Sequence, residues 1–403
     1  MKLLLLDQFS DPGGAQQSLL ELLPSIRARG WEAVAGLPGD GELFPRVREA
    51  GFEAVRIRCG PYTSGSKSLM DAARFVTGTP VLARQIRRLA GRFSPDLVYV
   101  NGPRLLPGVA WARLRTPVLF HSHSYLFPGV ARRLAGLSLR KCGAWVVGAC
   151  RFVADPWRPF ARPDRISVIY NGVAGPESPP PAGTPSHPPT VALIGRIAPE
   201  KGQREFVAAA AIIRRALPGC RLVVYGAALF GEAGALRYDA EVRAAAAPLG
   251  VEFAGWVTDI YAAFRSVDLL LVPSAGHEAT TRVILEAHAA GVPVIAFRSG
   301  GIPEVIEEGR DGWLAGSTEE MAGLAIELLT GDPSRLSEVS RAARLTWRRK
   351  FTLDRYHQEL LDAMERASLP GSSGAANSGR SRLQPASGAA QPARRHPGSP
   401  TFS

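Results

Sequence analysis

The sequence predicts an α/β protein made of two doubly wound domains, each built on a parallel sheet. Three observations lead to this fold class. Short apolar segments alternate with helix-length segments in both halves of the chain, which is the pattern of parallel strands joined by crossover helices. The stretch 174–189 between the halves holds too much proline for a helix or a central strand, and we predict a boundary loop there. The length of 403 residues is also typical of two domains.

Twelve apolar segments are predicted as strands from their length and their flanking turn residues. In the first half these segments are 2–6, 32–36, 54–57, 97–100, 118–121, 144–148 and 166–169, and in the second half 190–194, 221–225, 251–254, 269–273 and 294–296. Helices are predicted between them, among others over 16–29, 203–215 and 281–290. The tail 368–403 is rich in Gly, Ser, Ala, Pro and Arg, so it is predicted to be disordered.

The composition excludes several classes of protein. A content of 46% hydrophobic and 21% charged residues is that of a globular chain, and the glycines and prolines show no collagen-like period. No apolar stretch approaches the roughly 20 residues that cross a bilayer. The apolar run 3–6 meets Asp7 too early for a signal peptide, so we expect a cytoplasmic location.

Cysteine usage argues against a zinc site or a disulfide framework. The four cysteines are scattered and form no Cys-x-x-Cys pair: Cys59, Cys142, Cys150 and Cys220. We therefore expect them to be small buried apolar residues.

Positive charge is concentrated in the first half of the chain. The formal net charge is +12, and residues 1–173 alone carry 24 basic and 12 acidic side chains. Such an asymmetry indicates an anionic partner, which is a membrane surface, a lipid phosphate or, with less support, nucleic acid. An arginine-rich surface that meets only solvent explains the same charge. No recognised nucleic-acid module accompanies the charge, so we expect no nucleic-acid partner.

Two basic groups in this half have helical spacing. The first is an amphipathic segment with Arg84, Arg87, Arg88 and Arg92, and the second follows residues 125–128 and holds Arg132, Arg133, Arg140 and Lys141. Either group is suited to anionic lipid headgroups, which would place the protein at the inner face of the membrane. Ordinary surface helices with an arginine face are the favoured interpretation.

The segment 255–314 contains the clearest candidate binding site. A predicted strand, 269–273, runs into a loop of small residues, 274–280, and then into the helix predicted from about residue 281. A loop at the beginning of a helix is a natural anion site, because free backbone amides and the positive end of the helix dipole face it. Two carboxylates, Glu278 and Glu286, bracket this element. Eight helical residues rise about 12 Å, a span that suits the two ends of an extended ligand.

A basic loop lies upstream of this element. Arg196 and Lys201 follow the strand 190–194 and precede the helix 203–215. The two cations can converge on a diphosphate and neutralise it without a metal. The sequence contains no Asp-x-Asp pair of the kind that holds a divalent cation with a pyrophosphate. We therefore expect neither a metal nor another cofactor.

Two features of the first half of the chain are further candidates for ligand binding. Gly13 and Gly14 precede the helix 16–29, and their small size lets the backbone approach a phosphate or an acceptor. His121 and His123 follow the strand 118–120, at the carboxyl edge where open α/β sheets place ligands. A tight turn and hydrogen bonds at the strand end are the alternative roles.

These motifs together resemble the retaining glycosyltransferases of family 4, which have the GT-B fold. The resemblance is carried by Glu278-x7-Glu286, by Gly195-Arg196-x4-Lys201-Gly202 and by the segments 299–304 and 169–173, and it covers residues 1–365. It implies that Arg196 and Lys201 bind the donor diphosphate, that Glu286 binds the ribose and that Glu278 binds the transferred sugar. It also implies that the Gly13–Gly14 loop faces the donor, and that His121 or His123 lies near the sugar.

The resemblance implies a nucleotide-activated sugar as donor, no metal, and retention of the anomeric configuration. It also implies a domain organisation, with two Rossmann-like domains that face each other across a cleft. Residues 1–173 are the acceptor-binding domain, 174–189 the linker and 190–350 the nucleotide-sugar-binding domain. Residues 351–367 form a C-terminal helix that crosses back to the first domain. The acceptor, a sugar or a lipid-linked or cell-envelope glycan, is expected to contact loops such as 60–68.

One departure from the family pattern affects the sugar pocket. Ala279, Thr280 and Thr281, followed by Arg282, stand where the family often has Gly and an aromatic residue. The loop amides are unaffected, so Thr280 and Thr281 are counted among the donor-binding residues. The identity of the sugar does not follow from the sequence.

Two other functions fit the same architecture. A nucleotide-sugar epimerase would interconvert the donor without an acceptor. A catalytically degenerate scaffold would bind membranes through its basic half, and nucleotide sugars would not protect it against heat. The retained Glu, Arg and Lys set favours the transferase.

Overall fold

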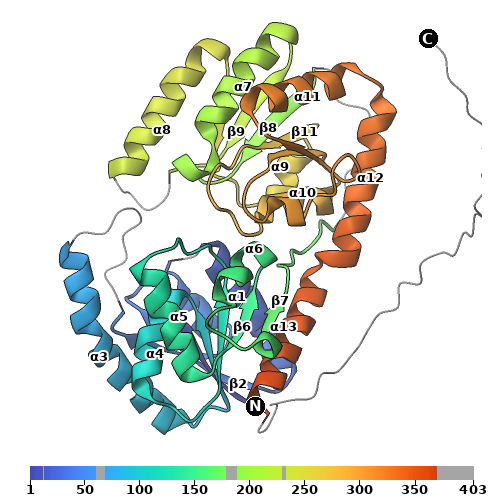
Figure 1. Ribbon diagram of the computed structural model, residues 1–403. Coiled ribbons are helices and arrows are strands. Elements are labelled where there is room, and N and C mark those ends of the chain that lie inside the picture. Colours follow the sequence, from blue (N-terminus) through green and yellow to red (C-terminus); the bar gives the residue numbers. More distant parts are fainter. Residues whose placement is uncertain (12, 60–68, 178–187, 229–232, 370–403) are drawn as a thin grey trace, which may run out of the picture.

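A computed structural model describes residues 1–11, 13–59, 69–177, 188–228 and 233–369. It contains two α/β domains, one above the other in Figure 1. The predicted linker 174–189, loop 60–68 and tail 368–403 lie wholly or mostly outside the described residues. No helix in the described ranges is both long and apolar enough to span a membrane.

The N-terminal domain is built on a seven-stranded parallel sheet with the order β3-β2-β1-β4-β5-β6-β7. Its strands are β1 (Lys2–Asp7), β2 (Glu32–Pro38), β3 (Glu53–Ile57), β4 (Leu97–Asn101), β5 (Val118–Ser122), β6 (Trp145–Gly148) and β7 (Ile166–Val168). Its helices are α1 (Gly14–Ala28), α2 (Leu43–Glu49), α3 (Leu69–Phe93), α4 (Leu106–Ala112), α5 (Val130–Cys142) and α6 (Arg151–Ala154).

The C-terminal domain repeats this arrangement with six parallel strands in the order β10-β9-β8-β11-β12-β13. Its strands are β8 (Thr190–Ile194), β9 (Arg221–Tyr225), β10 (Glu252–Gly255), β11 (Leu269–Val272), β12 (Val294–Phe297) and β13 (Trp313–Ala315). Its helices are α7 (Gln203–Ala216), α8 (Ala233–Ala246), α9 (Ile260–Phe264), α10 (Arg282–Ala290), α11 (Thr318–Thr330) and α12 (Pro333–Lys350).

The predicted fold class is confirmed, and all twelve predicted strands form within two residues of their expected ends. Helices cover both faces of each sheet, so central strands such as β4, β8 and β11 are buried at every residue. Such strands are continuous apolar runs, which the sequence reveals directly. The edge strand β13 was not predicted, because three residues are too few to give a recognisable pattern.

Each sheet begins in its middle, and this topology fixes where ligands bind. The chain starts at β1 or β8, builds toward one edge, and then returns to build toward the other edge. The crossover connections diverge between β1 and β4, and between β8 and β11, which leaves a crevice at the carboxyl ends of these strands.

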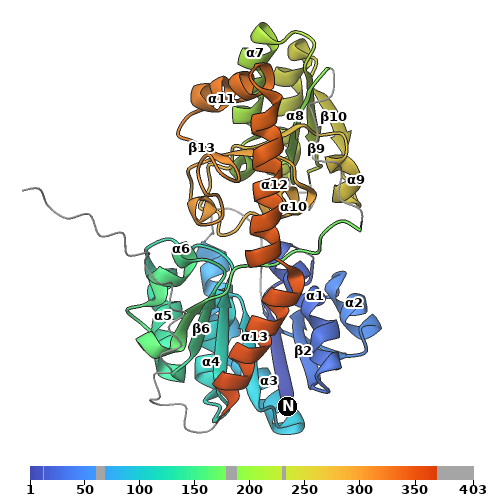
Figure 2. The ribbon, with the colours of Figure 1, turned by 90° about the vertical axis from the view of Figure 1, so that its right-hand side faces the viewer.

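A final helix, α13 (Leu353–Ser368), joins the two domains. Helix α12 packs against α10 of the C-terminal domain, whereas α13 packs against α1 and the strands of the N-terminal sheet. Tyr356, Leu360 and Met364 are buried in the N-terminal core. Figure 2 shows the two helices along one side of both domains.

The segment 169–173 crosses the chain between α12 and α13. The Val173 amide donates to the Phe351 carbonyl over 3.0 Å, and the Trp347 indole donates to the Val173 carbonyl over 3.1 Å. Gly172 allows this close crossing, since a Cβ there would lie 2.3 Å from the Thr352 carbonyl oxygen. Both connections between the domains therefore pass through one point.

Candidate active site

A pocket opens at the crevice of the C-terminal sheet, where β8 and β11 end and α10 begins. Its walls come from the ends of strands β8 and β11, the two loops that follow them and helix α10: Leu193, Ile194, Gly195, Arg196, Lys201, Leu271, Val272, Ser274, Thr281, Arg282 and Val283. The pocket therefore brings together the two predicted basic residues and the beginning of the predicted helix. This is the place where the topology of the sheet predicts a ligand.

Lys201 and Glu278 form an ion pair at one end of the pocket. Lys201 Nζ lies 2.6 Å from Glu278 Oε1, and the two side chains are 25% and 18% exposed. Gly202 brings their loops together, because its φ of +76° and its lack of a Cβ let it pack on the Pro273 carbonyl at the end of β11. Arg196 pairs with Glu200 on the short turn Pro199–Lys201.

Helix α10 begins at Arg282, so Glu278 lies in the loop before it. The helical rise used to relate Glu278 and Glu286 therefore does not apply to this pair. Glu286 lies inside α10, 16% exposed, with Oε1 3.7 Å from Arg282 Nε. Burial raises the pKa of Glu286, and the charge of Arg282 acts in the opposite direction.

The two threonines before α10 have different environments. Thr280 Oγ1 accepts a hydrogen bond of 2.8 Å from the Asn171 amide, which ties the loop to the segment 169–173. Thr281 is the N-cap of α10 and lines the pocket. Its buried hydroxyl oxygen has no partner among the described residues. Thr281 is thus the threonine whose hydroxyl is available to a ligand in the pocket.

The Gly13–Gly14 turn faces this pocket from the N-terminal domain. Gly13 is the N-cap of α1, and a Cβ on Gly14 would lie 3.9 Å from Arg282 Cδ. Asp7, at the end of β1, accepts hydrogen bonds from the Gln16 amide and the Phe9 backbone, each at 2.8 Å, and from Asn101. Complete burial raises the pKa of Asp7 to about 6, although these donors act to lower it.

His121 and His123 lie at the carboxyl end of β5 and differ in burial. His121 is fully buried, and its Nδ1 lies 2.7 Å from the Tyr99 hydroxyl. The ring of His123 lies over it with 3.8 Å between centroids. Burial, followed by the charge of Arg282, lowers the pKa of His123 to about 4, and burial also lowers that of His121. Both rings are therefore neutral at pH 7, and His123 is the more exposed of the two.

Glu304 caps a helix of the opposite domain. Its carboxylate accepts hydrogen bonds of 2.8 Å from the backbone amides of Arg151 and Phe152, at the beginning of α6, and one of 2.9 Å from the Tyr170 hydroxyl. The Gly301 amide donates to the Glu278 carbonyl over 2.8 Å. The segment 299–304 thus supports the Glu278 loop and holds the N-terminal domain against it.

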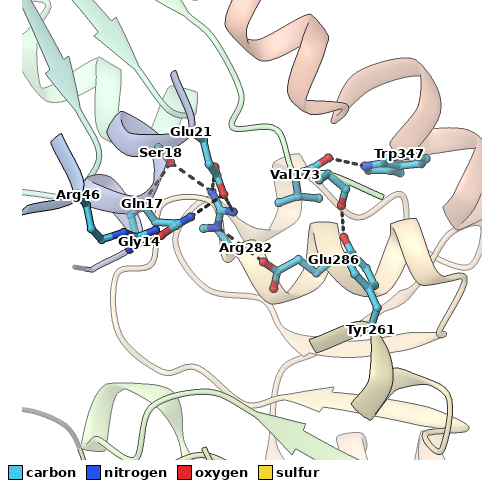
Figure 3. A network of polar contacts seen from close by, with 11 residues as sticks. Gly14, Gln17, Ser18, Glu21, Arg46, Val173, Tyr261, Arg282, Glu286 and Trp347 are labelled. Carbon is cyan, nitrogen blue, oxygen red and sulfur yellow. Dashed lines mark hydrogen bonds and ion pairs between the residues drawn. The ribbon is translucent and has the colours of Figure 1, made fainter. Parts of the chain in front are cut away.

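Sequence reasoning missed a contact that joins helix α10 to the N-terminal domain beside the pocket. Arg282 of α10 forms a bidentate ion pair with Glu21 of α1, at 2.8 and 3.0 Å, and Ser18 accepts a further bond of 3.3 Å (Figure 3). The sequence marks Arg282 only as a departure from a family pattern, and no local signal marks Glu21. The pair depends on how the two domains meet, which a single sequence does not encode locally.

A group of aromatic rings lies beside Glu278. Tyr125 stacks on Phe152 with 4.6 Å between centroids and on His277 with 5.1 Å, and Phe127 meets His277 edge to face at 4.5 Å. Phe127 is 58% exposed. These rings come from both domains, so they form an apolar boundary at this end of the cleft.

Three or more His, Cys, Asp or Glu side chains do not gather into a metal-binding group anywhere in the described ranges. The four cysteines are free and lie apart. The charge at the pocket itself is supplied by Arg196, Lys201 and Arg282.

Two family models match the chain. Residues 13–172 match a model described as glycosyl transferase 4-like domain, and residues 188–331 match one described as glycosyl transferases group 1. Each match covers one of the two domains.

Relatives match over most of the chain. The D-inositol 3-phosphate glycosyltransferase of Corynebacterium glutamicum is 32% identical over 386 residues, which cover 84% of this chain and 89% of the relative. The phosphatidyl-myo-inositol mannosyltransferase of Mycobacterium leprae is 27% identical over 352 residues, with 83% and 88% covered. Among solved structures, Anabaena HepE in complex with UDP and glucose has a TM-score of 0.74 and 25% identity, covering 91% of this chain and 99% of HepE.

Proposed function

We propose that this chain, which belongs to the group 1 glycosyl transferases with the GT-B fold, moves a sugar from a nucleoside-diphosphate sugar to a lipid-linked or glycan acceptor. Transfer retains the anomeric configuration and needs no metal. The observation that carries the proposal is the pocket between β8, β11 and α10. Arg196, Lys201 and the α10 N-terminus line it, and two of its lining residues, Lys201 and Arg282, pair with Glu278 and Glu286 respectively.

The donor diphosphate lies across the beginning of α10. The free amides of the first turn and the positive end of the helix dipole face the pocket, and Lys201 and Arg196 add two positive charges. These groups stabilise the negative charge that grows on the departing nucleotide, so they act more strongly in the transition state than on the bound donor. They supply the charge that a divalent cation would otherwise provide.

The two carboxylates orient the ends of the donor. Glu286 accepts hydrogen bonds from the ribose hydroxyls, and Glu278 accepts them from the transferred sugar. The ion pair with Lys201 holds the Glu278 carboxylate between the sugar and the diphosphate. His123, neutral at pH 7, is a hydrogen-bonding partner for the sugar rather than a cation.

The acceptor hydroxyl attacks from the face that the nucleotide leaves, and a phosphate oxygen of the departing group takes its proton. The new glycosidic bond forms as the bond between anomeric carbon and phosphate oxygen breaks, and the nucleoside diphosphate carries the displaced electron pair away. No protein nucleophile takes part. The protein contributes orientation and charge stabilisation. The nucleotide-bound state of HepE supports a nucleotide sugar as donor.

A nucleotide panel tests this function. We expect one of UDP, GDP or ADP, or its sugar, to raise the melting temperature in proportion to the logarithm of ligand concentration, because only the folded chain binds it. The Lys201→Met variant should lose this shift, whereas Arg243→Met, which removes an exposed cation on α8, should keep it. No shift with any nucleotide contradicts the proposal. An epimerised nucleotide sugar formed without acceptor would indicate the epimerase instead.

We also propose that the N-terminal domain docks on an anionic bilayer that carries the acceptor. Val130, Leu134 and Leu137 form an exposed apolar stripe on α5, 83%, 41% and 54% exposed. Helix α4 packs against both α3 and α5, and exposed apolar residues also lie on these neighbours, Val76 on α3 and Trp111 on α4. Arg132, Arg133, Arg140 and Lys141 of α5 supply charge of the sign that anionic headgroups attract.

Vesicle sedimentation tests this surface. The double variant Leu134→Ser/Leu137→Ser should lower binding to vesicles containing phosphatidylglycerol by tenfold or more, because each buried leucine contributes about 1.5 kcal/mol. Leu236→Ser/Leu345→Ser removes two leucines of the C-terminal domain that are at least as exposed, and it should leave binding unchanged. Equal loss in both variants, or binding that salt does not weaken, contradicts docking through this surface.

A further inference from the structure

Arg282 connects the donor pocket to the acceptor-binding domain. Its Nη1 and Nη2 lie 3.0 and 2.8 Å from the two carboxylate oxygens of Glu21, and its Nε lies 3.7 Å from Glu286 (Figure 3). The Arg282, Glu21 and Glu286 side chains are 18%, 18% and 16% exposed. One guanidinium therefore pairs with carboxylates from two domains, and all three side chains are largely buried.

The two edges of the Arg282 guanidinium contact different carboxylates. The outer edge, Nη1 and Nη2, forms a fork that matches the Glu21 carboxylate, and Nη1 also bonds to Ser18 Oγ. The inner side, at Nε, points along α10 toward Glu286, one turn away. A planar group with five donors can hold both carboxylates at once, which a lysine ammonium cannot do with the same geometry.

The N-terminal side of this contact is itself fixed. Glu21 Oε1 accepts a hydrogen bond of 3.1 Å from Gln17, and Gln17 Oε1 accepts one of 3.4 Å from Arg46. All these residues lie on one side of α1 or on the adjacent α2. The Arg282 stem passes beside the beginning of α1, where a Cβ on Gly14 would lie 3.9 Å from Arg282 Cδ, at ordinary contact distance. The helix that starts at the Gly13–Gly14 turn is thereby attached to α10.

We propose that Arg282 is a positioning residue for the donor, which holds the Glu286 carboxylate toward the pocket and, through Glu21, couples donor binding to closure of the two domains. The inference rests on the proposed function and extends it. Without Arg282, the Glu21 and Glu286 carboxylates face each other at the domain boundary without a cation. Their repulsion pushes the domains apart and turns Glu286 away from the ribose site.

The two halves of this role are separable by mutation. Arg282→Met removes both contacts, so it should weaken binding of UDP or GDP, whichever the wild-type protein binds, by roughly tenfold or more, and lower kcat as well. Glu21→Gln keeps the Arg282–Glu286 contact, so nucleotide affinity should stay within about threefold while kcat falls by about tenfold. The double variant Arg282→Met/Glu21→Gln should recover part of the loss seen in Arg282→Met, because the repulsion between the Glu21 and Glu286 carboxylates disappears with the Glu21 charge. Arg282→Lys should fall between wild type and Arg282→Met.

The experiment combines calorimetry with UDP and GDP, steady-state transfer kinetics and small-angle scattering with and without nucleotide. We expect nucleotide to compact the wild type, and to compact Glu21→Gln less. Arg204→Met, which removes an exposed C-terminal ion pair with Glu241, is the control and should match the wild type in all three.

Three outcomes overturn the inference. They are an unchanged nucleotide affinity in Arg282→Met, an unchanged kcat in Glu21→Gln, or losses in melting temperature alone. Failure of the wild type to bind any nucleoside diphosphate would instead refute the proposed function.

Discussion

Glutamine in place of Glu278 is expected to lower kcat by about 10²–10³-fold, with little change in the affinity for the nucleoside diphosphate, because a charged acceptor is lost from the sugar end of the site. Glu278 is 18% exposed and lies 2.6 Å from Lys201, so its carboxylate is fixed between the sugar and the diphosphate. The neutral amide keeps the shape of the side chain, but it offers one acceptor oxygen and places an NH2 group against the lysine. Steady-state transfer kinetics and calorimetry with the nucleoside diphosphate measure the two effects.

The matched control for this change is Glu241→Gln. Glu241 is an acidic residue of the same domain that pairs with Arg204, and both side chains are exposed. We expect wild-type kinetics from it, since exposed pairs contribute little. Turnover of Glu278→Gln within threefold of the wild type would contradict the sugar-binding role of Glu278. It would not by itself contradict nucleotide binding in the pocket.

Methionine in place of Lys201 is expected to have an even larger effect on kcat/KM, a loss of about 10³-fold, because one change removes two contributions. The cation that neutralises the departing diphosphate is lost. The Glu278 carboxylate, which now lacks its partner, then repels the same diphosphate. The nucleotide affinity should fall together with kcat, in contrast to Glu278→Gln. Calorimetry and initial rates at several donor concentrations separate these two parameters.

Lys350→Met provides the control for this second change, because Lys350 is an exposed residue at the end of α12 in the same domain. Its kinetics should equal those of the wild type. The account of the diphosphate site would be wrong if Lys201→Met bound the nucleotide as tightly as the wild type.

Most of the fold could be predicted because buried parallel strands are continuous apolar runs. The strands β1, β4, β5, β8 and β11 are buried at nearly every position, so their sequences differ sharply from the helices around them. The pattern failed at β13, where three residues at a sheet edge carry no comparable signal. The predicted and the observed strand ends differ by one or two residues, because solvent and loop geometry decide where a strand stops.

The pocket could be predicted in part because its residues are local to a strand, a loop and a helix. Lys201 and the α10 N-terminus come from such units, and each unit brings its side chains to the carboxyl edge of the sheet. The contacts of Glu304 with α6 and of Arg282 with α1 join segments more than 150 residues apart. Their geometry depends on the packing of two domains, so neither the cap nor the ion pair leaves a trace in the local sequence.

The choice between His121 and His123 shows the same limit. Alternation along a strand predicts that the two rings point to the same side, and the structure places them side by side with 3.8 Å between centroids. His121 lies deeper and forms a hydrogen bond with Tyr99 of the neighbouring strand. That partner comes from β4, and only the assembled sheet brings it there.

The most direct test of the central claim is a crystal structure of the protein with the nucleoside diphosphate that stabilises it. The account predicts the diphosphate at the first turn of α10, within hydrogen-bonding distance of Arg196 and Lys201, with the ribose hydroxyls on Glu286. A nucleotide bound at the Gly13–Gly14 turn of the N-terminal domain, with the pocket between β8 and β11 left empty, would contradict it.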